Sequence, residues 1–317
     1  MSDTIDSNFS EDNGSVSYPP KPELLERNQN SLTRSLLSLL LYALLFYFIF
    51  DANVAYIAAV LVVIIIHELG HFAFMRLFQY SNVKIFIVPL LGAFTSGIKQ
   101  QISQRQLTLI ILGGPVPGIV IGCALLWFNR DLNNENVKML YQTFLVINLL
   151  NLLPFHPLDG GRLLETLFFK DNFVIRLAFG IVSILALLAM FLFINSPVLI
   201  IVPFLIAFEL YNENKLQKIR TYLKEEKIDF YIDYENLSNK NYWLIRDCLL
   251  LSFPRKYKGM SPGNYEYSIV ESLLVQQTKS VLQPNLKFDI KIFGRILVMI
   301  FYVFILIAPI GWYFQFK

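Results

Sequence analysis

Two histidines and a glutamate lie together at residues 67–71, in the run His-Glu-Leu-Gly-His. On a helix, His67 and His71 are one turn apart and lie on the same face. Two imidazoles so placed can bind one zinc ion, and Glu68 beside them can act as a general base. Five residues can also match such a motif by chance. The pattern favours a zinc site, because these are two of only three histidines in the chain.

The residues around this motif indicate that it lies inside a membrane. Residues 54–66, directly before it, contain no charged side chain. The whole chain is 55% hydrophobic and only 16% charged, whereas about a quarter of a soluble globular protein is charged. Histidine and glutamate inside an apolar span are costly to bury and usually mark a functional site. The composition therefore predicts a polytopic membrane protein with a buried site.

The net charge and the cysteines argue against two other classes of protein. A formal net charge of +3 is too small to indicate binding to nucleic acid. Cys123 and Cys248 fit neither a CxxC redox site nor a disulfide framework. We expect both to be packing thiols.

Seven apolar stretches are candidate membrane spans, at residues 36–50, 54–78, 107–128, 139–153, 173–194, 198–208 and 296–314. A hydrocarbon core of about 30 Å needs about 20 helical residues, so the fourth and sixth stretches are short for a span. The third is interrupted by glycines and prolines at residues 113–118. We predict an all-α polytopic membrane protein with a six-helix core and a C-terminal seventh span.

Changes in composition divide the chain into four predicted parts. Residues 1–30 are polar and contain two adjacent prolines, which predicts a disordered cytosolic tail. Residues 31–211 hold the transmembrane core, and residues 291–317 hold the last span. Residues 212–290 are polar and lysine-rich, with apolar residues at helical spacing, which predicts a small cytosolic helical domain. The helices expected there lie near residues 216–223, 244–248 and 265–277. With no catalytic motif of its own, this domain is a candidate for binding a regulatory protein.

The segment between the second and third spans, residues 80–106, allows two interpretations. Val83–Val88 is strand-like, and Pro89 and Gly92 follow it. A β-hairpin dipping into the membrane is one possibility, provided that its backbone is buried against protein or water. An ordinary cytosolic loop is the other.

The distribution of lysine and arginine predicts the orientation in the membrane. With a cytosolic N-terminus and seven alternating spans, the outer segments hold only Arg130, Lys138 and Lys317. The other 24 of the 27 basic residues then lie on the cytosolic side or at its interface. Because positive charge gathers on the cytosolic side, we expect a cytosolic N-terminus and an external C-terminus.

The fourth span leads to a candidate third ligand, Asp159. His67 lies thirteen residues after Val54, about 20 Å along the second span at 1.5 Å per residue. The fourth span descends about 22 Å before Pro154, and prolines and glycines then make regular helix improbable. Asp159 thus reaches about the depth of His67 and could complete a His₂-carboxylate set with an open fourth position. Asp159 could instead cap a helix that begins near Gly160.

These motifs together resemble the site-2 protease family of intramembrane zinc metalloproteases. The resemblance rests on HELGH at 67–71 and on Asn151-Leu152-Leu153-Pro154 followed by Leu158-Asp159-Gly160, and it covers roughly residues 54–165. It implies that His67, His71 and Asp159 bind one zinc ion per chain and that Glu68 is the catalytic base. Asn151 matches the family asparagine thought to hold the substrate or its oxyanion. Nothing in the family pattern covers residues 212–290.

The resemblance implies an endopeptidase that cleaves transmembrane segments of other membrane proteins near the cytosolic side of the bilayer. We expect an integral, multi-pass protein of a bacterial inner membrane. A catalytically degenerate member that binds or chaperones membrane proteins is one alternative, although every expected catalytic residue type is present. A metal or small-solute transporter is another, but it would need more paired polar residues in several spans.

Three further polar residues near Asp159 have open roles. His156 could be a substitute ligand, a proton shuttle, a hydrogen-bonding partner of a ligand or a structural hydrogen-bonding group. Arg162 fits the cytosolic interface, with a salt bridge to a site carboxylate as the alternative. Asn148 lies one turn from Asn151 and is expected to form hydrogen bonds between helices.

Overall fold

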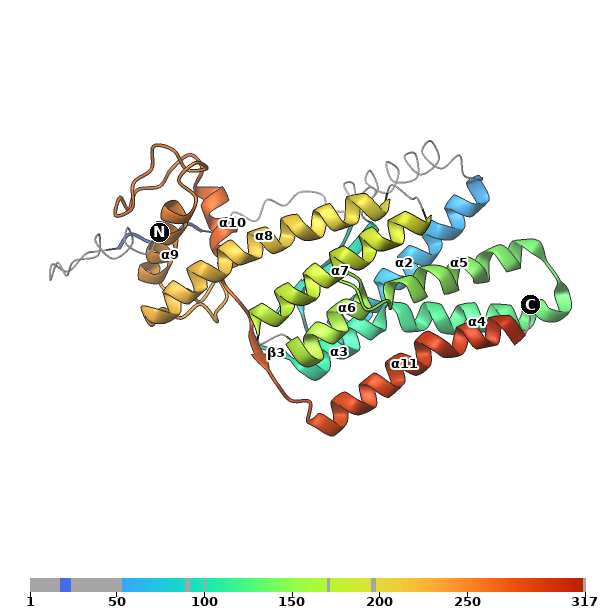
Figure 1. The fold of residues 1–317 in the computed structure, drawn as a ribbon. Coiled ribbons are helices and arrows are strands. Elements are labelled where there is room, and N and C mark those ends of the chain that lie inside the picture. Colours follow the sequence, from blue (N-terminus) through green and yellow to red (C-terminus); the bar gives the residue numbers. More distant parts are fainter. Residues whose placement is uncertain are drawn as a thin grey trace. The chain divides into compact units, whose positions relative to one another are not determined.

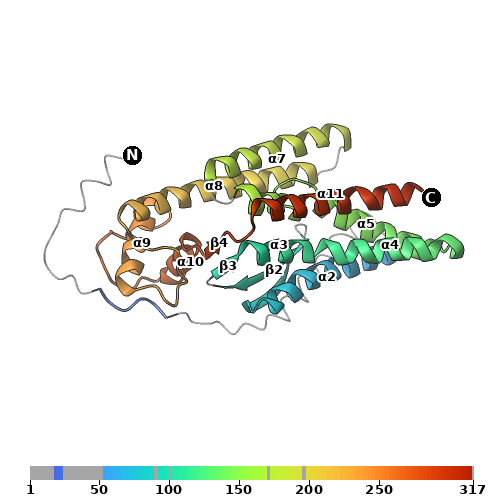
Figure 2. The ribbon, with the colours of Figure 1, turned by 90° about the horizontal axis from the view of Figure 1, so that it is seen from below.

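The computed structural model describes residues 18–23, 53–88, 92–99, 101–169, 172–194 and 198–315. The chain forms two compact units (Figures 1 and 2). We call Glu26–Gln217 with Pro284–Lys317 the core unit, and Met1–Leu25 with Lys218–Gln283 the insert unit. Helix α8 (Val198–Glu225) begins in the core unit and ends in the insert unit.

Helices make up most of the core unit, as predicted for an all-α membrane protein. They are α2 (Val54–Leu77), α3 (Gln104–Gly113), α4 (Pro115–Leu132), α5 (Glu135–Asn151), α6 (Asp159–Leu164), a π-helical turn (Glu165–Phe169), α7 (Phe173–Ile194), the first part of α8, and α11 (Ile292–Gln315). The strands are β1 (Ser81–Val88), β2 (Gly92–Ile98), β3 (Gln101–Ser103) and β4 (Asn285–Lys287).

Four helical stretches of the described chain are long and apolar enough to cross a membrane. They are Val54–Leu77, Gln104–Leu132, Phe173–Leu192 and Ile292–Gln315. Each overlaps a predicted span, and the chain is a membrane protein. The predicted span at 36–50 lies outside the described residues.

The two short predicted spans correspond to α5 and to the start of α8. At 17 residues, α5 is about 26 Å long, which is less than the hydrocarbon thickness. The predicted span at 198–208 is the start of the 28-residue α8, which continues through a polar sequence. No turn residue interrupts the helix at 208, so the change from apolar to polar composition does not end it. The number of spans therefore stays a prediction.

Helix α2, which carries the His-Glu-Leu-Gly-His motif, has well-defined ends. The side chain of Asn53 accepts a hydrogen bond from the Ala55 N–H (2.9 Å) and caps its first turn. Gln79, with φ of 61°, turns the chain out of the helix toward β1. Residues 80–106 contain a β-hairpin rather than only a loop: β1 and β2 pair antiparallel, with Phe86 opposite Phe94 and Ile85 opposite Thr95. That the hairpin dips into the membrane stays a prediction.

Close contacts at glycines bring the helices of the core unit together. A Cβ at Gly70 of α2 would lie 2.0 Å from the carbonyl oxygen of Gly113 in α3. A Cβ at Gly122 of α4 would lie 2.8 Å from the Leu145 side chain of α5. Neither pair of helices could approach so closely with a larger residue.

A parallel pairing of β3 with β4 joins segments that are far apart in the sequence. Gln101 lies opposite Asn285, and Ser103 opposite Lys287. The hydroxyl of Ser103 also donates to the Asp289 carboxylate (2.5 Å). This pairing was not predicted, because three-residue strands leave no periodic pattern.

The insert unit is built around two helices, α9 (Asn239–Ser252) and α10 (Glu271–Val281), with the end of α8. Helix α10 begins six residues later than the predicted 265–277 segment. Its carboxylate at Glu271 is buried and lies 3.1 Å from Arg246 Nε of α9, and it accepts a short hydrogen bond from the Tyr242 hydroxyl. Residues 18–23 of the predicted disordered tail are ordered against this unit.

A buried carboxyl in α9 should make the stability of the insert unit depend on pH. Burial raises the pKa of Asp247 to about 6, although the Gly263 N–H donates to it (3.1 Å). A carboxyl group whose pKa is higher in the folded than in the unfolded state makes the protein less stable as pH rises. For Asp247 this loss of stability occurs between about pH 4 and pH 6. Asparagine has no charge to bury, so Asp247→Asn avoids this loss. We expect the unfolding temperature of the variant minus that of the wild type to be a few degrees higher at pH 8 than at pH 4.

Trp243 of α9 can report this transition when Trp127 and Trp312 are replaced by phenylalanine, since the chain has three tryptophans. Thermal scans of the detergent-solubilised chain at a series of pH values would measure it. An offset between variant and wild type that is the same at pH 4 and pH 8 would contradict the assignment.

Candidate metal centre

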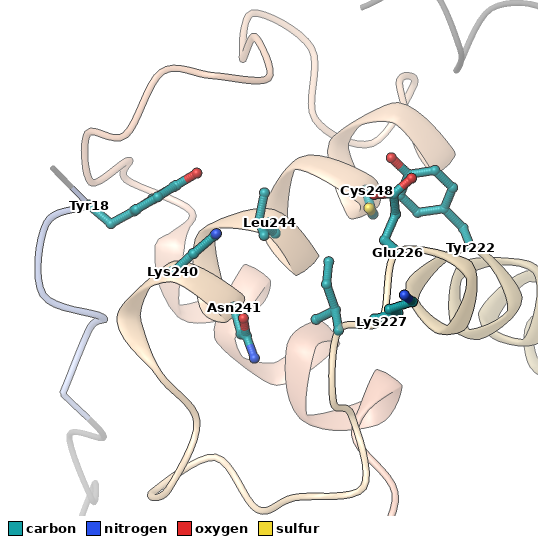
Figure 3. A pocket seen from close by; sticks show the side chains of 9 residues that line it. Tyr18, Tyr222, Glu226, Lys227, Lys240, Asn241, Leu244 and Cys248 are labelled. Atoms are coloured by element: carbon teal, nitrogen blue, oxygen red, sulfur yellow. The ribbon is translucent and has the colours of Figure 1, made fainter. Parts of the chain in front are cut away.

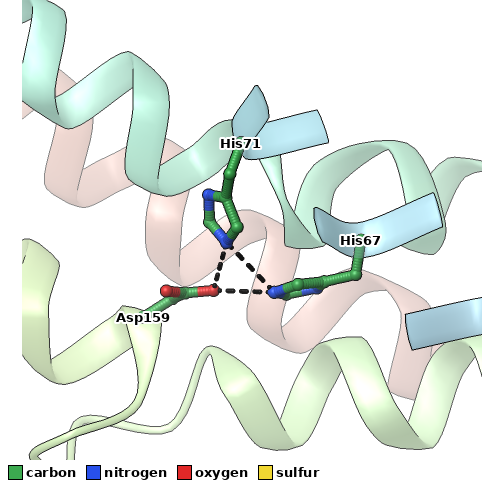
Figure 4. Close-up of side chains that lie close together, drawn as sticks. All are labelled: His67, His71 and Asp159. Carbon is green, nitrogen blue, oxygen red and sulfur yellow. Dashed lines mark hydrogen bonds and ion pairs between the residues drawn. The ribbon is translucent and has the colours of Figure 1, made fainter. Parts of the chain in front are cut away.

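His67, His71 and Asp159 converge on one point in the core unit (Figure 4). His67 Nε2 lies 3.1 Å from His71 Nε2 and 3.0 Å from Asp159 Oδ2. His71 Nε2 lies 3.2 Å from the same Asp159 oxygen. All three side chains are buried, with 6 to 9% of each residue exposed.

The outer ring nitrogens of both histidines are held by acceptors. His67 Nδ1 lies 2.8 Å from Asn148 Oδ1, and His71 Nδ1 lies 2.8 Å from the Ile110 carbonyl oxygen. Asn148 Nδ2 donates to the Phe144 carbonyl (2.8 Å), which fixes its oxygen toward His67. Each Nδ1 must therefore donate a proton, so a neutral ring presents the lone pair of Nε2 to the centre.

Three electron-pair donors thus face one another in a buried place. Asp159 Oδ2 is buried and receives no hydrogen bond. Ligand bonds of 2.0–2.1 Å at tetrahedral angles put ligand atoms about 3.3 Å apart, close to the three separations here. Two imidazoles and one carboxylate are a donor set that suits zinc. The residues fit a zinc ion.

The structure decides between the two sequence interpretations of Asp159. It is the first residue of α6, and Leu158 rather than Asp159 holds the N-cap position. Instead Asp159 lies against the two histidines. The hydroxyl of Tyr302 in α11 donates to the Leu152 carbonyl (2.6 Å), and Gly160 packs so closely that a Cβ would lie 2.1 Å from that same oxygen. These contacts hold the end of α5 and the start of α6 in place.

Two glycines leave room for the centre. A Cβ at Gly114 would lie 2.3 Å from His71 Nε2. A Cβ at Gly118 would lie 2.2 Å from Asn148 Nδ2, the amide that orients His67. Both glycines lie in the 113–118 run that interrupts the third predicted span, where they were expected to permit close helix approach.

Glu68 is buried beside the centre, with 5% of the residue exposed. The Thr95 hydroxyl of β2 donates to its Oε2 (2.7 Å). Both residues line a cavity of about 420 Å³, together with His67, His71, Asn151 and Asp159. Thr95 was not identified from the sequence, because only the folding of the hairpin against α2 brings it to Glu68.

Asn151, which was predicted to hold the substrate or its oxyanion, lines this cavity. One of its amide hydrogens is used within its own helix. Its Nδ2 donates to the Ile147 carbonyl of its own helix (3.1 Å). The neighbouring Asn148 is the asparagine that contacts a histidine of the centre, and it does bridge helices as expected. The role of Asn151 stays a prediction.

His156 is a hydrogen-bonding group in this structure. Its Nδ1 lies 2.9 Å from Glu165 Oε1, and its Nε2 lies 3.2 Å from Glu209 Oε2. Each ring nitrogen of His156 therefore faces a carboxylate oxygen, which accepts a hydrogen bond. A ring that donates from both nitrogens has no lone pair for a metal. Arg162 is exposed.

Comparisons with known proteins match the same part of the chain. Residues 55–135 match the model of peptidase family M50. A zinc metalloprotease of Methanocaldococcus jannaschii is 27% identical over 175 residues, which are 52% of this chain and 50% of that protein. Stage IV sporulation protein FB of Bacillus subtilis is 31% identical over 114 residues, which are 35% of this chain and 39% of that protein.

The solved site-2 protease from Methanocaldococcus jannaschii is 22% identical, with a TM-score of 0.43 over 56% of this chain and 88% of that one. The chain spans half or less of the length of the two relatives above. The family match includes the His-Glu-Leu-Gly-His motif of α2, and the first relative extends over about half of the chain. The chain is therefore similar to peptidase family M50 over residues 55–135, and to the two relatives over about half of its length or less.

Proposed function

We propose that this protein is an intramembrane zinc endopeptidase that hydrolyses peptide bonds in or near transmembrane segments of membrane proteins. The observation that carries the proposal is the buried cluster of His67, His71 and Asp159, with the Glu68 carboxylate beside it in an apolar helix. Residues 55–135, which include His67, Glu68 and His71, match peptidase family M50, and one relative is named a zinc metalloprotease. We infer one zinc ion per chain.

The site residues divide the chemistry among them. A zinc ion held there supplies Lewis-acid chemistry and lowers the pKa of water to about 7. Glu68 takes the proton from the attacking water and later passes it to the leaving amine. Asn151 has a second amide N–H besides the one that Ile147 accepts, and this donor is the candidate for stabilising the oxyanion.

The substrate must unwind before it can react, because the carbonyls of a helix are held in hydrogen bonds. We infer that it is held extended by pairing with the edge of the β1–β2 hairpin, on the Val83–Val88 side. Phe94 and Thr95 of the same hairpin line the cavity at the centre, which supports this inference. The bond cleaved then lies toward the cytosolic side, in the predicted orientation with a cytosolic N-terminus, in a bacterial inner membrane.

The hairpin edge can be tested by Phe86→Pro. Proline removes a backbone N–H from β1 and disfavours regular pairing at that position. We expect cleavage to fall at least about tenfold, since one or more hydrogen bonds to the substrate, each worth about 1 kcal/mol, are lost. Phe86→Leu is the matched control, because it changes the side chain and keeps the N–H. Unchanged cleavage by a folded Phe86→Pro protein would remove the edge from the mechanism.

Thr95 should act as a positioning residue for Glu68. Thr95→Val keeps the shape of the side chain and removes the hydroxyl that donates to the carboxylate. A hydrogen bond to a charged group is worth about 1.5–3 kcal/mol, so we expect kcat to fall about 10- to 100-fold with little change in zinc content. Thr95→Ser keeps the hydroxyl and should retain most activity. Equal rates for the valine and serine variants would show that the hydroxyl has no such role.

The substrates can be sought by comparing membrane-protein fragments in cells that carry either the wild type or Glu68→Gln. Fragments that depend on Glu68 and end within or beside apolar segments support the endopeptidase. Their absence, with zinc bound, supports a degenerate member that binds membrane proteins without cleaving them.

A further inference from the structure

Six residues of the insert unit, Tyr18-Pro19-Pro20-Lys21-Pro22-Glu23, lie along a row of aromatic side chains. We call Tyr234, Trp243, Tyr265 and Tyr267 the aromatic row. Three prolines in six residues hold the backbone near the polyproline II conformation, in which carbonyls form no internal hydrogen bonds. Such a segment therefore offers its carbonyls to a partner surface.

Each proline carbonyl accepts a hydrogen bond from a member of the row. Trp243 Nε1 donates to the Pro19 carbonyl (2.8 Å), and the Tyr267 hydroxyl to that of Pro20 (2.6 Å). The Tyr234 hydroxyl donates to the Pro22 carbonyl (2.9 Å). Aromatic rings with a polar tip that bind a polyproline II segment are a recurrent way of recognising proline-rich peptides.

The lysine between the prolines is recognised separately. Its ammonium donates to the carbonyls of Tyr234 (2.7 Å), Glu235 (2.7 Å) and Leu237 (2.6 Å), so all three of its hydrogens are used. Its N–H donates to the Asn239 side chain (3.0 Å). This arrangement selects an ammonium group at one position between two prolines.

Tyr18 completes the contact. Its ring centroid lies 5.0 Å from that of Tyr265, which in turn lies 5.6 Å from the ring of Trp243. Tyr18 is also one wall of a pocket of about 390 Å³ whose other walls include Lys240 and Leu244 of α9 (Figure 3). The segment is therefore part of the surface of the folded unit.

We propose that the insert unit is a recognition module for short proline-rich protein segments that carry a lysine between two prolines, and that Tyr18–Glu23 is its internal ligand. A partner protein with such a segment binds the aromatic row by displacing the internal one. The hydrogen bonds use proline carbonyls, one backbone N–H and one ammonium group of the segment, so any segment with this pattern can repeat them. The proposal does not depend on the proposed protease activity.

The internal ligand should compete strongly with a partner. A segment tethered to its own site has an effective concentration that reaches the order of millimolar when the linker allows it to bind. A free peptide should therefore bind the wild-type chain at least about tenfold more weakly than a chain whose internal segment has been disabled.

The test uses the full-length chain in detergent, with Trp127→Phe and Trp312→Phe so that Trp243 alone emits. Tyr18→Ala combined with Lys21→Ala removes the ring contact and the ammonium from the internal segment. We expect the emission of Trp243 to change, because the indole N–H loses the Pro19 carbonyl. Glu23→Ala is the matched control from the same segment and should leave the emission as in wild type.

A blocked peptide of residues 18–23 is then added. We expect it to restore the wild-type emission of the Tyr18→Ala/Lys21→Ala chain, with an apparent Kd at least tenfold lower than for the wild-type chain. The same peptide with alanine in place of Lys21 should bind at least tenfold more weakly. If the double variant loses helix content by circular dichroism, Lys21→Met, which keeps the stem of the side chain, takes its place.

Two results would overturn the proposal. In the first, the Tyr18→Ala/Lys21→Ala chain is folded, but its Trp243 emission still differs from that of the wild type at about 10 mM peptide. The other is equal binding of the lysine and alanine peptides, which would leave only a nonspecific apolar contact.

Discussion

Replacing Glu68 by glutamine should abolish peptide-bond cleavage while leaving the metal centre intact. Glutamine has nearly the same shape and can still accept the hydrogen bond that Thr95 donates to Glu68. It cannot take a proton from water, and general acid–base catalysis is worth about 10²- to 10⁴-fold in rate. We expect a loss of that size in the initial rate on a transmembrane substrate in proteoliposomes.

The zinc content distinguishes loss of the base from loss of the site. Glu68 is not one of the three converging ligands, so Glu68→Gln should bind close to one zinc per chain, as measured by elemental analysis. Glu135→Gln, a change of an exposed glutamate in the first turn of α5, is the matched control and should retain full activity. Full activity of Glu68→Gln would refute the mechanism, and wild-type protein without zinc would favour the degenerate alternative.

Replacing Gly114 by alanine should remove the metal from the protein. The added methyl would lie 2.3 Å from His71 Nε2, well inside van der Waals contact. The ring must move, because the methyl is attached to the rigid backbone between α3 and α4. His71 would then lose the Ile110 carbonyl that orients it, and outer-shell partners of this kind are worth about 10- to 100-fold in metal affinity. We expect zinc affinity and activity to fall at least that much.

A matched control separates this effect from a general cost of alanine in an apolar helix. A Cβ at Gly311 in α11 meets nothing within 4 Å, so Gly311→Ala should bind zinc as the wild type does. If the clash acts through His71, Gly114→Ala should add little to the loss caused by His71→Ala. Additive losses from the two changes, or normal zinc affinity of Gly114→Ala, would contradict this account.

The sequence alone determined the class of the protein and half of the centre. Helical geometry fixes His67 and His71 on one face one turn apart, wherever the helix lies. The apolar runs around the motif identify a membrane protein, because charged residues are too costly in lipid to be placed at random. Four of the predicted spans follow from local composition, and the structure contains helices long and apolar enough for them. The hairpin was one of two interpretations that the sequence left open, and the structure contains it.

Local composition gave no signal for two features of the structure, the continuation of α8 and the order of residues 18–23. The change from apolar to polar residues near 208 does not stop α8, since leucine, lysine and glutamate are all good helix formers. The segment at 18–23 is polar and proline-rich, yet it is ordered. Its order comes from a tryptophan and tyrosines more than 200 residues away.

Only the tertiary structure decided how the centre is assembled. It places Asp159 within 3.2 Å of both histidines, rather than at a helix cap. It also supplies Asn148, the Ile110 carbonyl and Thr95, which orient the histidines and hold Glu68. These partners come from separate helices and a strand, and their distances depend on close helix contacts at glycines. Spacing along one helix is set by the backbone, whereas contacts between elements are set by packing, and packing cannot be read from a single segment.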